Sequence, residues 1–195
     1  MKGLRGAIAG VLIACVLQAC NGDHKAQNYN ALPVDTDGDT TPDTTVKLNM
    51  VVDSDDSQFA VEAMNAGTTE VALGKLAVKK GQSKVVKNFG AMMVKDHGKA
   101  DAKLLVLIKT KDIKSPVTPD AKSQALINKL SQKSGADFDK AYVSCMLDDH
   151  KDAVGLFTVE AKKLQDPDLK NFDIKTLPVL QNHLEEITAI HDNMK

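Results

Sequence analysis

The sequence predicts an all-α domain: an antiparallel up-down four-helix bundle with one short extra helix, preceded by a disordered tether. From residue 57 onward, apolar residues recur with the 3.6-residue period of helices packed on a core. No segment alternates with a period of two, and no hairpin turn signal is present. All five phenylalanines fall within the periodic segments. Helices with one apolar stripe bury it against each other, so a bundle is the expected architecture.

The first long helix is predicted to begin at Ser57 and to end before Gly81, and the second is predicted to follow Ser83 and to end before the break at Ser115. The first apolar stripe runs from Phe59 to Ala77, and the second runs from Val86 to Leu107. Ser83 has the side chain of a helix N-cap and would open the second helix. Because the connection between the two helices is so short, they must lie antiparallel.

A break at residues 115–119 precedes the short extra helix. Thr118 followed by Pro119 is typical of an N-cap and a first helical residue, so we expect a short helix from there to about Lys133. Ser134, with Asp137 three residues later, resembles a capping box and should open the third long helix.

The fourth long helix is predicted to begin at Asp166-Pro167 and to carry an apolar stripe from Leu169 to Ile190. Pro178 lies inside it. Proline has no backbone N–H, so it leaves the carbonyl of Ile174 without its helical partner. We therefore expect a kink or an interruption at this point.

The N-terminus has the layout of a bacterial lipoprotein signal. Lys2 and Arg5 precede a short apolar stretch that ends in Leu17-Gln18-Ala19-Cys20. The stretch is too short to span a bilayer but suits a cleavable signal peptide over residues 1–19. Cys20 would then receive lipid and anchor the chain to the membrane. The alternative is ordinary secretion with an incidental thiol at Cys20.

Residues 20–56 are polar and poor in aromatic side chains, which predicts a disordered tether, and residues 57–195 form the folded domain. Arg5 is the only arginine, so the mature chain has no bidentate phosphate-binding side chain and nucleic-acid binding is not expected. Cys145 is the one thiol left after processing at Cys20. It lies on an apolar stripe, which favours a buried hydrophobic role over a nucleophilic one.

Glu70, His97, His150 and His183 stand at similar heights in the predicted bundle. Counted from the end that the helices share, at ~1.5 Å per residue, they lie roughly 16, 20, 21 and 24 Å along their helices. Each comes from a different long helix. Bundles build metal sites from side chains that converge in this way, and nearby acids such as Asp96, Asp149 and Glu186 could orient the imidazoles.

This pattern supports a metal site of Glu70, His97, His150 and His183, holding zinc, copper or iron. The alternative is that the histidines only pack or pair within the bundle. The Glu-x-x-His pairs of di-iron bundles are missing, since Val94, Leu147 and Leu180 stand three residues before the histidines. No nucleophile elbow, phosphate loop or His-Glu-x-x-His motif points to hydrolysis.

Several segments together resemble the domain of unknown function 4142 family of bacterial envelope proteins. The resemblance covers about residues 55–192. Its matching text is Phe59, Glu70, Leu73–Ala77, Met93–His97, Phe138–Tyr142, His150, Leu156–Phe157, Thr176–Pro178 and His183–Leu184. It implies a ferritin-like helical bundle in an exported or outer-membrane protein, and it brings no established activity. Asn21 after Cys20 is similar to an outer-membrane sorting signal.

Taken together, these features predict an outer-membrane lipoprotein that presents a helical bundle in the periplasm. We expect a non-catalytic binding or envelope-stress role, with a metal ion as the candidate ligand and the membrane as a partner through Cys20. A purely structural bundle that binds another envelope protein is the first alternative. A metal-dependent oxidoreductase is the second.

Overall fold

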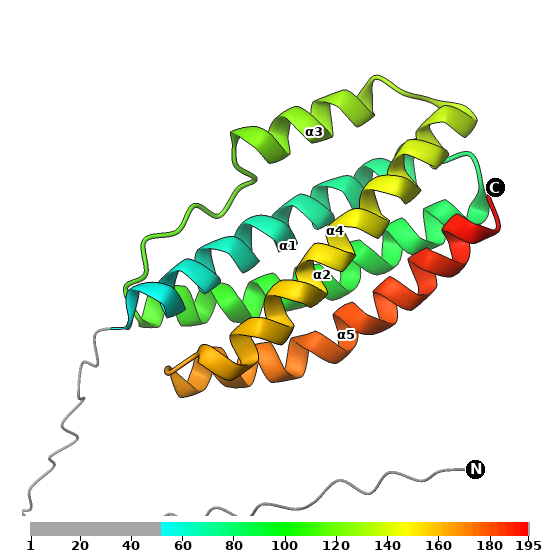
Figure 1. Ribbon diagram of the computed structural model, residues 1–195. Coiled ribbons are helices and arrows are strands. Elements are labelled where there is room, and N and C mark those ends of the chain that lie inside the picture. Colours follow the sequence, from blue (N-terminus) through cyan, green and yellow to red (C-terminus); the bar gives the residue numbers. More distant parts are fainter. Residues whose placement is uncertain (1–51, 195) are drawn as a thin grey trace, which may run out of the picture. The chain divides into compact units, whose positions relative to one another are not determined.

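The structure, a computed structural model, describes residues 52–194, which are helical and contain no strand (Figure 1). The helices are α1 (Ser54–Lys80), α2 (Lys84–Thr110), α3 (Ala121–Ser131), α4 (Gly135–Lys163) and α5 (Pro167–Asp192). The expected signal peptide, the expected lipidation site at Cys20 and the expected tether up to residue 51 lie outside this part. None of the described helices combines the length and apolarity that crossing a membrane requires.

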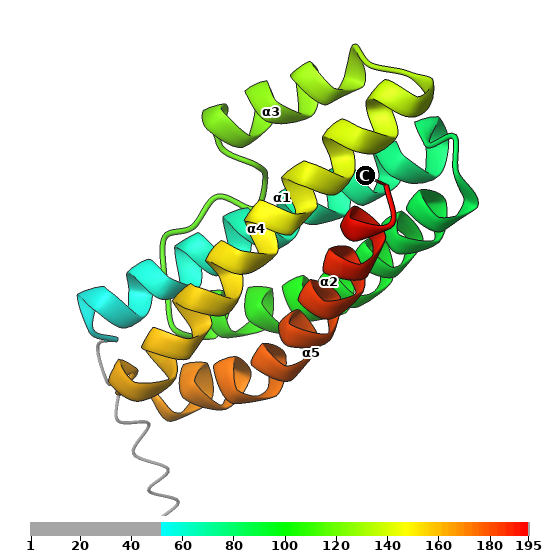
Figure 2. The same cartoon turned by 45° about the vertical axis from the view of Figure 1, so that its right-hand side comes forward.

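The four long helices form an antiparallel bundle, and α3 lies along its outside next to α1 (Figures 1 and 2). The helix α1 pairs with α2, and α4 pairs with α5, each through a short connection. The predicted fold class is therefore confirmed, including the short extra helix. The first helix begins at Ser54 rather than Ser57.

Two of the predicted helix starts are confirmed. The Ser83 hydroxyl accepts a hydrogen bond from the backbone N–H of Val86 at 3.1 Å and so caps α2. Asp166 caps α5, and Pro167 is its first residue. Both pairings satisfy N–H groups that a helix start leaves without partners.

The predicted start of α3 is wrong, whereas α4 begins after Ser134 as predicted and lacks only the expected side-chain cap bond. The helix α3 begins at Ala121, and its cap is Asp120, whose carboxylate accepts the backbone N–H of Ser123 at 2.7 Å. Asp120 is held there because its own N–H donates to Asn65 of α1 at 2.8 Å, a contact that the sequence does not reveal. Ser134 precedes α4 but makes no side-chain cap bond.

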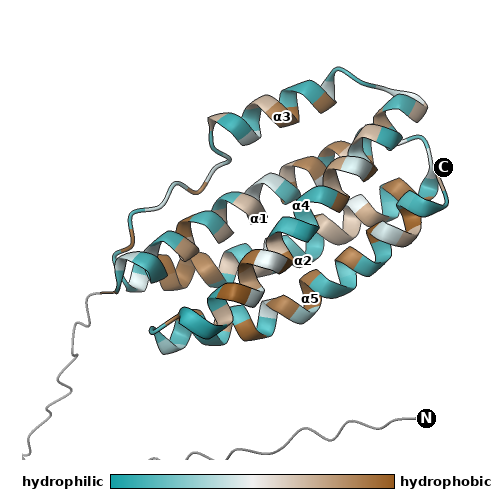
Figure 3. Cartoon of the chain, viewed as in Figure 1, coloured by the Kyte–Doolittle hydropathy of each residue, from teal (hydrophilic) through white to brown (hydrophobic). Residues whose placement is uncertain are grey.

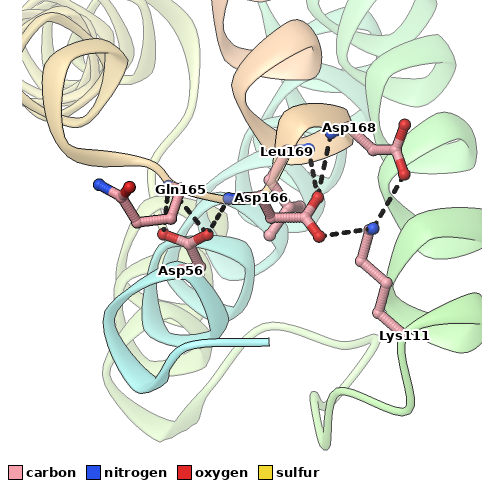
Figure 4. Close-up of polar contacts among 6 residues, drawn as sticks. All are labelled: Asp56, Lys111, Gln165, Asp166, Asp168 and Leu169. Carbon is pink, nitrogen blue, oxygen red and sulfur yellow. Dashed lines mark hydrogen bonds and ion pairs between the residues drawn. The ribbon is translucent and has the colours of Figure 1, made fainter. Parts of the chain in front are cut away.

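A polar junction fixes the end of the bundle where α1 begins and α4 connects to α5 (Figure 4). The Asp56 carboxylate accepts backbone N–H groups of Gln165 at 3.2 Å and of Asp166 at 2.6 Å. Asp166 in turn accepts the N–H groups of Asp168 and Leu169, both at 3.0 Å. Its second oxygen lies 2.7 Å from Nζ of Lys111, the residue that follows the last turn of α2. This junction links α1, α2 and α5.

The helix α5 continues through Pro178, so the expected interruption is wrong. Pro178 is exposed, and Ile174, whose carbonyl loses its partner, is 55% exposed. On this face water can replace the missing hydrogen bond, because the loss is costly only for a buried carbonyl.

The helices α1 and α2 approach closely through two glycines. A Cβ on Gly74 would lie 2.6 Å from the carbonyl oxygen of Gly90, and a Cβ on Gly90 would lie 2.7 Å from the Cβ of Ala77. Any larger residue at either position would push the backbones apart. This pair thus sets the spacing of α1 and α2 in the half of the bundle near residue 81.

The hydrophobic core consists of two clusters at opposite ends of the bundle, visible as apolar inner faces in Figure 3. The first includes Phe89, Phe138 and Tyr142, and the second includes Phe59 and Phe157. On every long helix, the residue that lies between the two clusters is polar. These residues, which we call the polar layer, are Glu70, His97, His150 and His183.

Candidate metal centre

The structure brings the four predicted site residues together inside the bundle. Glu70, His97, His150 and His183 come from α1, α2, α4 and α5, and each is at most 5% exposed. The three imidazole rings have centroid separations of 5.2, 5.5 and 5.7 Å. Three helices thus present one histidine each to a common point.

Each imidazole is held at one of its two ring nitrogens. His97 Nδ1 lies 2.9 Å from Glu70 Oε2, and His150 Nδ1 lies 2.9 Å from the carbonyl oxygen of Met146. His183 Nε2 lies 3.4 Å from Asp96 Oδ2. A carbonyl or carboxylate oxygen only accepts, so these ring nitrogens carry the hydrogen and donate it.

The opposite nitrogen of each ring is buried and has no protein partner among the described residues. These atoms are His97 Nε2, His150 Nε2 and His183 Nδ1. In a neutral imidazole whose other nitrogen is protonated, such an atom offers a lone pair. One nitrogen from each histidine can be chosen so that all three lie within 4.8 Å of one another. Three buried histidine nitrogens this close together can serve as the donor set of a metal site.

Glu70 occupies a different position from the three histidines. Its carboxylate contacts the protonated Nδ1 of His97, and its other oxygen lies 3.4 Å from His150 Nδ1. That second contact is no hydrogen bond, because His150 directs its N–H to Met146, and Glu70 Oε1 is left without a hydrogen-bond partner. Carboxylates on the far nitrogen of a metal-binding imidazole fix its tautomer and its orientation.

The electrostatics of the polar layer keep two of the imidazoles neutral. Burial lowers the pKa of His150 and, with repulsion from His97 and His150, lowers the pKa of His183 to about 4. For His97, burial opposes the charged form, but Glu70, together with Asp101 and Asp96, outweighs it and raises the pKa of this imidazole. Burial also opposes the ionisation of Glu70, but the three histidines, His97 foremost, outweigh it, so the pKa of this carboxyl is lowered.

The orienting partners differ from those that the sequence suggested. Asp96 contacts His183 across the bundle instead of the neighbouring His97, because adjacent helix residues point about 100° apart. Asp149 accepts a hydrogen bond from the Cys145 thiol at 3.3 Å. Glu186 is exposed and has no part in the cluster. The partner of His150 is the backbone carbonyl of Met146, which side-chain chemistry alone could not have predicted.

Asp101 is a further member of the site that the sequence analysis missed. It lines a cavity of about 20 Å³ together with Glu70 and His97. Burial raises the pKa of its carboxyl to about 7, with the attraction of His97 working against that rise. Asp101 lies four residues after His97 and so on the same face of α2, and this spacing could have indicated it from the sequence. A Cβ at Gly67 of α1 would collide with the Asp101 carboxylate, so this position of the helix requires glycine.

Cys145 and His191 are not part of the site. The Cys145 thiol is a free, half-buried group whose pKa is raised, first by burial and then by Asp149. A nucleophilic thiol needs a lowered pKa, so the prediction of a hydrophobic role agrees with its surroundings. His191 lies at the end of α5, where its Nδ1 is 3.3 Å from Asp192 Oδ1.

A groove of about 520 Å³ between α1, α3 and α4 leads from the surface to Glu70. Five carboxylates line it and a single lysine, Lys122, opposes them. They are Glu62, Glu70, Asp120, Asp149 and Asp152. A cleft lined by one sign of charge raises the local concentration of the opposite ion, so this groove favours the approach of cations.

Comparison with known proteins places the chain in a family. The model of the family described as "Domain of unknown function (DUF4142)" matches residues 41–190. A solved structure entitled "Crystal structure of DUF305 fragment from Deinococcus radiodurans" is similar in fold, with a TM-score of 0.64 at 11% identity. The match covers 73% of this chain and 98% of that one. No protein in the curated collection matches the sequence.

Proposed function

This chain belongs to the DUF4142 family, and we propose that it is a lipid-anchored envelope protein that binds a transition-metal ion. The family is a domain of unknown function, so the proposal rests on the residues of this chain alone. His97, His150 and His183 are the proposed ligands. Glu70 and Asp96 are proposed to orient two of them, which changes the role first expected for Glu70.

The observation that carries the proposal is the set of three unpartnered, buried ring nitrogens at the centre of the bundle. A buried polar atom without a partner costs about 1–3 kcal/mol. Three such atoms in one layer lower the stability of the fold considerably, compared with a layer of apolar residues. A bound metal ion would satisfy all three at once.

The donor set indicates the class of metal. Imidazole nitrogens suit zinc, copper, iron and nickel, whereas calcium and magnesium prefer oxygen. A tetrahedral ion with bonds of ~2.0–2.1 Å would hold its nitrogens roughly 3.3 Å apart. The three rings would therefore draw closer on binding. The fourth position would remain for a water molecule or another ligand.

The position in the cell envelope rests on the N-terminal pattern that ends in Cys20. We propose that lipid on Cys20 anchors the protein to the outer membrane, with the bundle in the periplasm. Metabolic labelling with radioactive palmitate tests this step. Label should enter the wild-type chain and be absent from Cys20→Ser, and label in both would exclude Cys20 as the lipidated residue.

Metal analysis of the purified, untagged full chain tests the binding function. After incubation with Zn²⁺ or Cu²⁺ and removal of excess ion, we expect one ion per chain and a higher melting temperature, because a ligand that binds only the folded state stabilises it. His97→Ala combined with His150→Ala should lose both effects. The matched control, His191→Ala, lies outside the cluster and should keep them.

If neither ion is retained and neither raises the melting temperature, the proposal is wrong. The three histidines would then be a polar layer that sets the packing of the helices. Equal binding by the wild type and the double variant would also contradict it, since the ion would then be held elsewhere.

A further inference from the structure

A second groove opens on the side of the bundle opposite the acidic one. It lies between α2 and α5, has a volume of about 620 Å³ and is in the size range of small-molecule sites. We propose that this groove, which we call the lysine groove, binds a small amphipathic anion with one carboxylate and a short apolar chain. This site is separate from the metal proposal and requires no ion.

Charge is the first argument for an anion. Lys99 and Lys103 of α2 and Lys175 of α5 line the groove, and none of them has an ion-pair partner among the described residues. Since Lys99 and Lys103 are four residues apart, they share one face of α2. Lysine side chains on both walls can thus approach one anionic group.

The two acidic residues of the lysine groove, Asp96 and Asp168, offset the charge of its three lysines only in part. Asp96 faces His183 Nε2 at 3.4 Å, and Asp168 pairs with Lys111 at 2.9 Å. Both carboxylates are therefore already engaged by donors. The three lysines leave an excess of positive charge that a bound carboxylate would neutralise.

The apolar part of the lining is the second argument. Side chains of Met92, Leu107, Phe172 and Val179 line the groove between the lysines. Val179 is 38% exposed, so part of this apolar lining is in contact with water. An inorganic ion would leave this surface in water, whereas an alkyl chain would cover it.

The groove also touches the polar layer. His183 is 2% exposed, yet it lines the lysine groove together with its partner Asp96. A ligand in the groove would therefore lie against the outer side of one proposed metal ligand. Anion binding and metal binding can then influence each other through the Asp96–His183 pair.

Calorimetric titration of the metal-free full chain tests the lysine groove directly. The probes are octanoate, 1-octanol and octylammonium, which share a chain length and differ in charge. We expect octanoate to bind at one site and more tightly than the other two. Equal binding of all three would overturn the proposal, because it would show apolar partition without recognition of charge.

Variants locate the binding. Replacing Lys99, Lys103 and Lys175 together by Gln should weaken octanoate about tenfold, which corresponds to ~1.4 kcal/mol. The control triple variant, with Lys84, Lys129 and Lys140 changed to Gln, removes the same charge from exposed positions outside the groove. It should bind as the wild type does, and an equal loss in both triple variants would contradict a site in this groove.

A second pair of variants leaves the lysines in place. Val179→Glu puts a negative charge in the groove and should weaken octanoate, whereas Val85→Glu, at a 53% exposed position elsewhere, should not. Binding unaffected by Val179→Glu would exclude the lysine groove. Because these titrations contain no metal, their failure would leave the metal proposal untouched, and failure of metal binding would leave this site intact.

Discussion

At the scale of single residues, Glu70 could either orient His97 or bind the metal itself, and a single substitution separates these two roles. Glu70 contacts Nδ1 of His97, whereas Nε2 of the same ring is the unpartnered nitrogen. Glu70→Gln keeps an oxygen that can accept the N–H of His97 but removes the charge. Loss of such an orienting partner typically costs 10–100-fold in metal affinity.

We therefore expect Glu70→Gln to retain one metal ion per chain with ~10–100-fold weaker binding. Competition titration with a chelating dye measures this change. Glu62→Gln, in the same acidic groove but away from the histidines, is the matched control. Complete loss of binding in Glu70→Gln would instead make Glu70 a ligand.

Asp173 predicts a pH dependence of stability. It is fully buried, both of its oxygens lack a hydrogen-bond partner, and burial, with a smaller effect of Glu160, raises the pKa of its carboxyl to about 6. The unfolded chain has the ordinary value of 3.8. Between these two values the folded state binds more protons than the unfolded state, so this carboxyl lowers stability as the pH rises through that range.

Asp173→Asn removes the charge and should raise the free energy of unfolding at pH 8 by roughly 1–3 kcal/mol. At acidic pH, where the wild-type carboxyl is protonated, the difference should shrink. Urea unfolding at both pH values measures it. Asp152→Asn, on an exposed position, should behave as the wild type does, and a gain at acidic pH alone would refute this assignment.

At the scale of helices, the close approach of α1 and α2 depends on Gly74. Gly74→Ala would place a methyl group 2.6 Å from the Gly90 carbonyl oxygen. Overpacking of this kind costs typically 1–3 kcal/mol. Thermal unfolding should show the loss. In contrast, Gly155→Ala meets nothing within 4 Å and should stabilise α4 by roughly 0.5–1 kcal/mol. Equal effects at the two positions would argue against close packing.

Asp166 and Asp168 separate helix capping from surface pairing. Both lie within 3 Å of Lys111 Nζ, but only Asp166 also caps α5 with two backbone hydrogen bonds. Loss of such a cap costs about 0.5–2 kcal/mol, whereas an exposed ion pair contributes about 0–1 kcal/mol. Asp166→Ala should therefore lower the urea midpoint clearly more than Asp168→Ala. The reverse order would show that the Lys111 pair dominates this junction.

The helices themselves could be predicted because their signals are local. Apolar periodicity and the caps at Ser83 and Asp166 depend on neighbours in the sequence, and the structure agrees with them. The predicted cap of α3 was wrong because the actual cap, Asp120, is held in place by Asn65, which lies 55 residues away in the sequence. The same limit applied to Pro178, since its effect depends on which face of α5 is exposed.

At the scale of the whole molecule, the bundle contains two hydrophobic clusters separated by a polar layer. The heights of its members could be predicted, because the helical rise is constant and short connections fix antiparallel neighbours. The rotation of each side chain could not. These rotations determine that Asp96 contacts His183. They also determine that Glu70 contacts Nδ1 of His97 and not its unpartnered Nε2.

The central claim is that three imidazoles converge on one ion. X-ray absorption spectroscopy of the zinc-loaded full chain tests it most directly. The account predicts three imidazole nitrogens at ~2.0–2.1 Å and one oxygen ligand from water or an added anion. A first shell of fewer than three imidazoles, or one built on carboxylate oxygens or on the sulfur of Cys145, would contradict it.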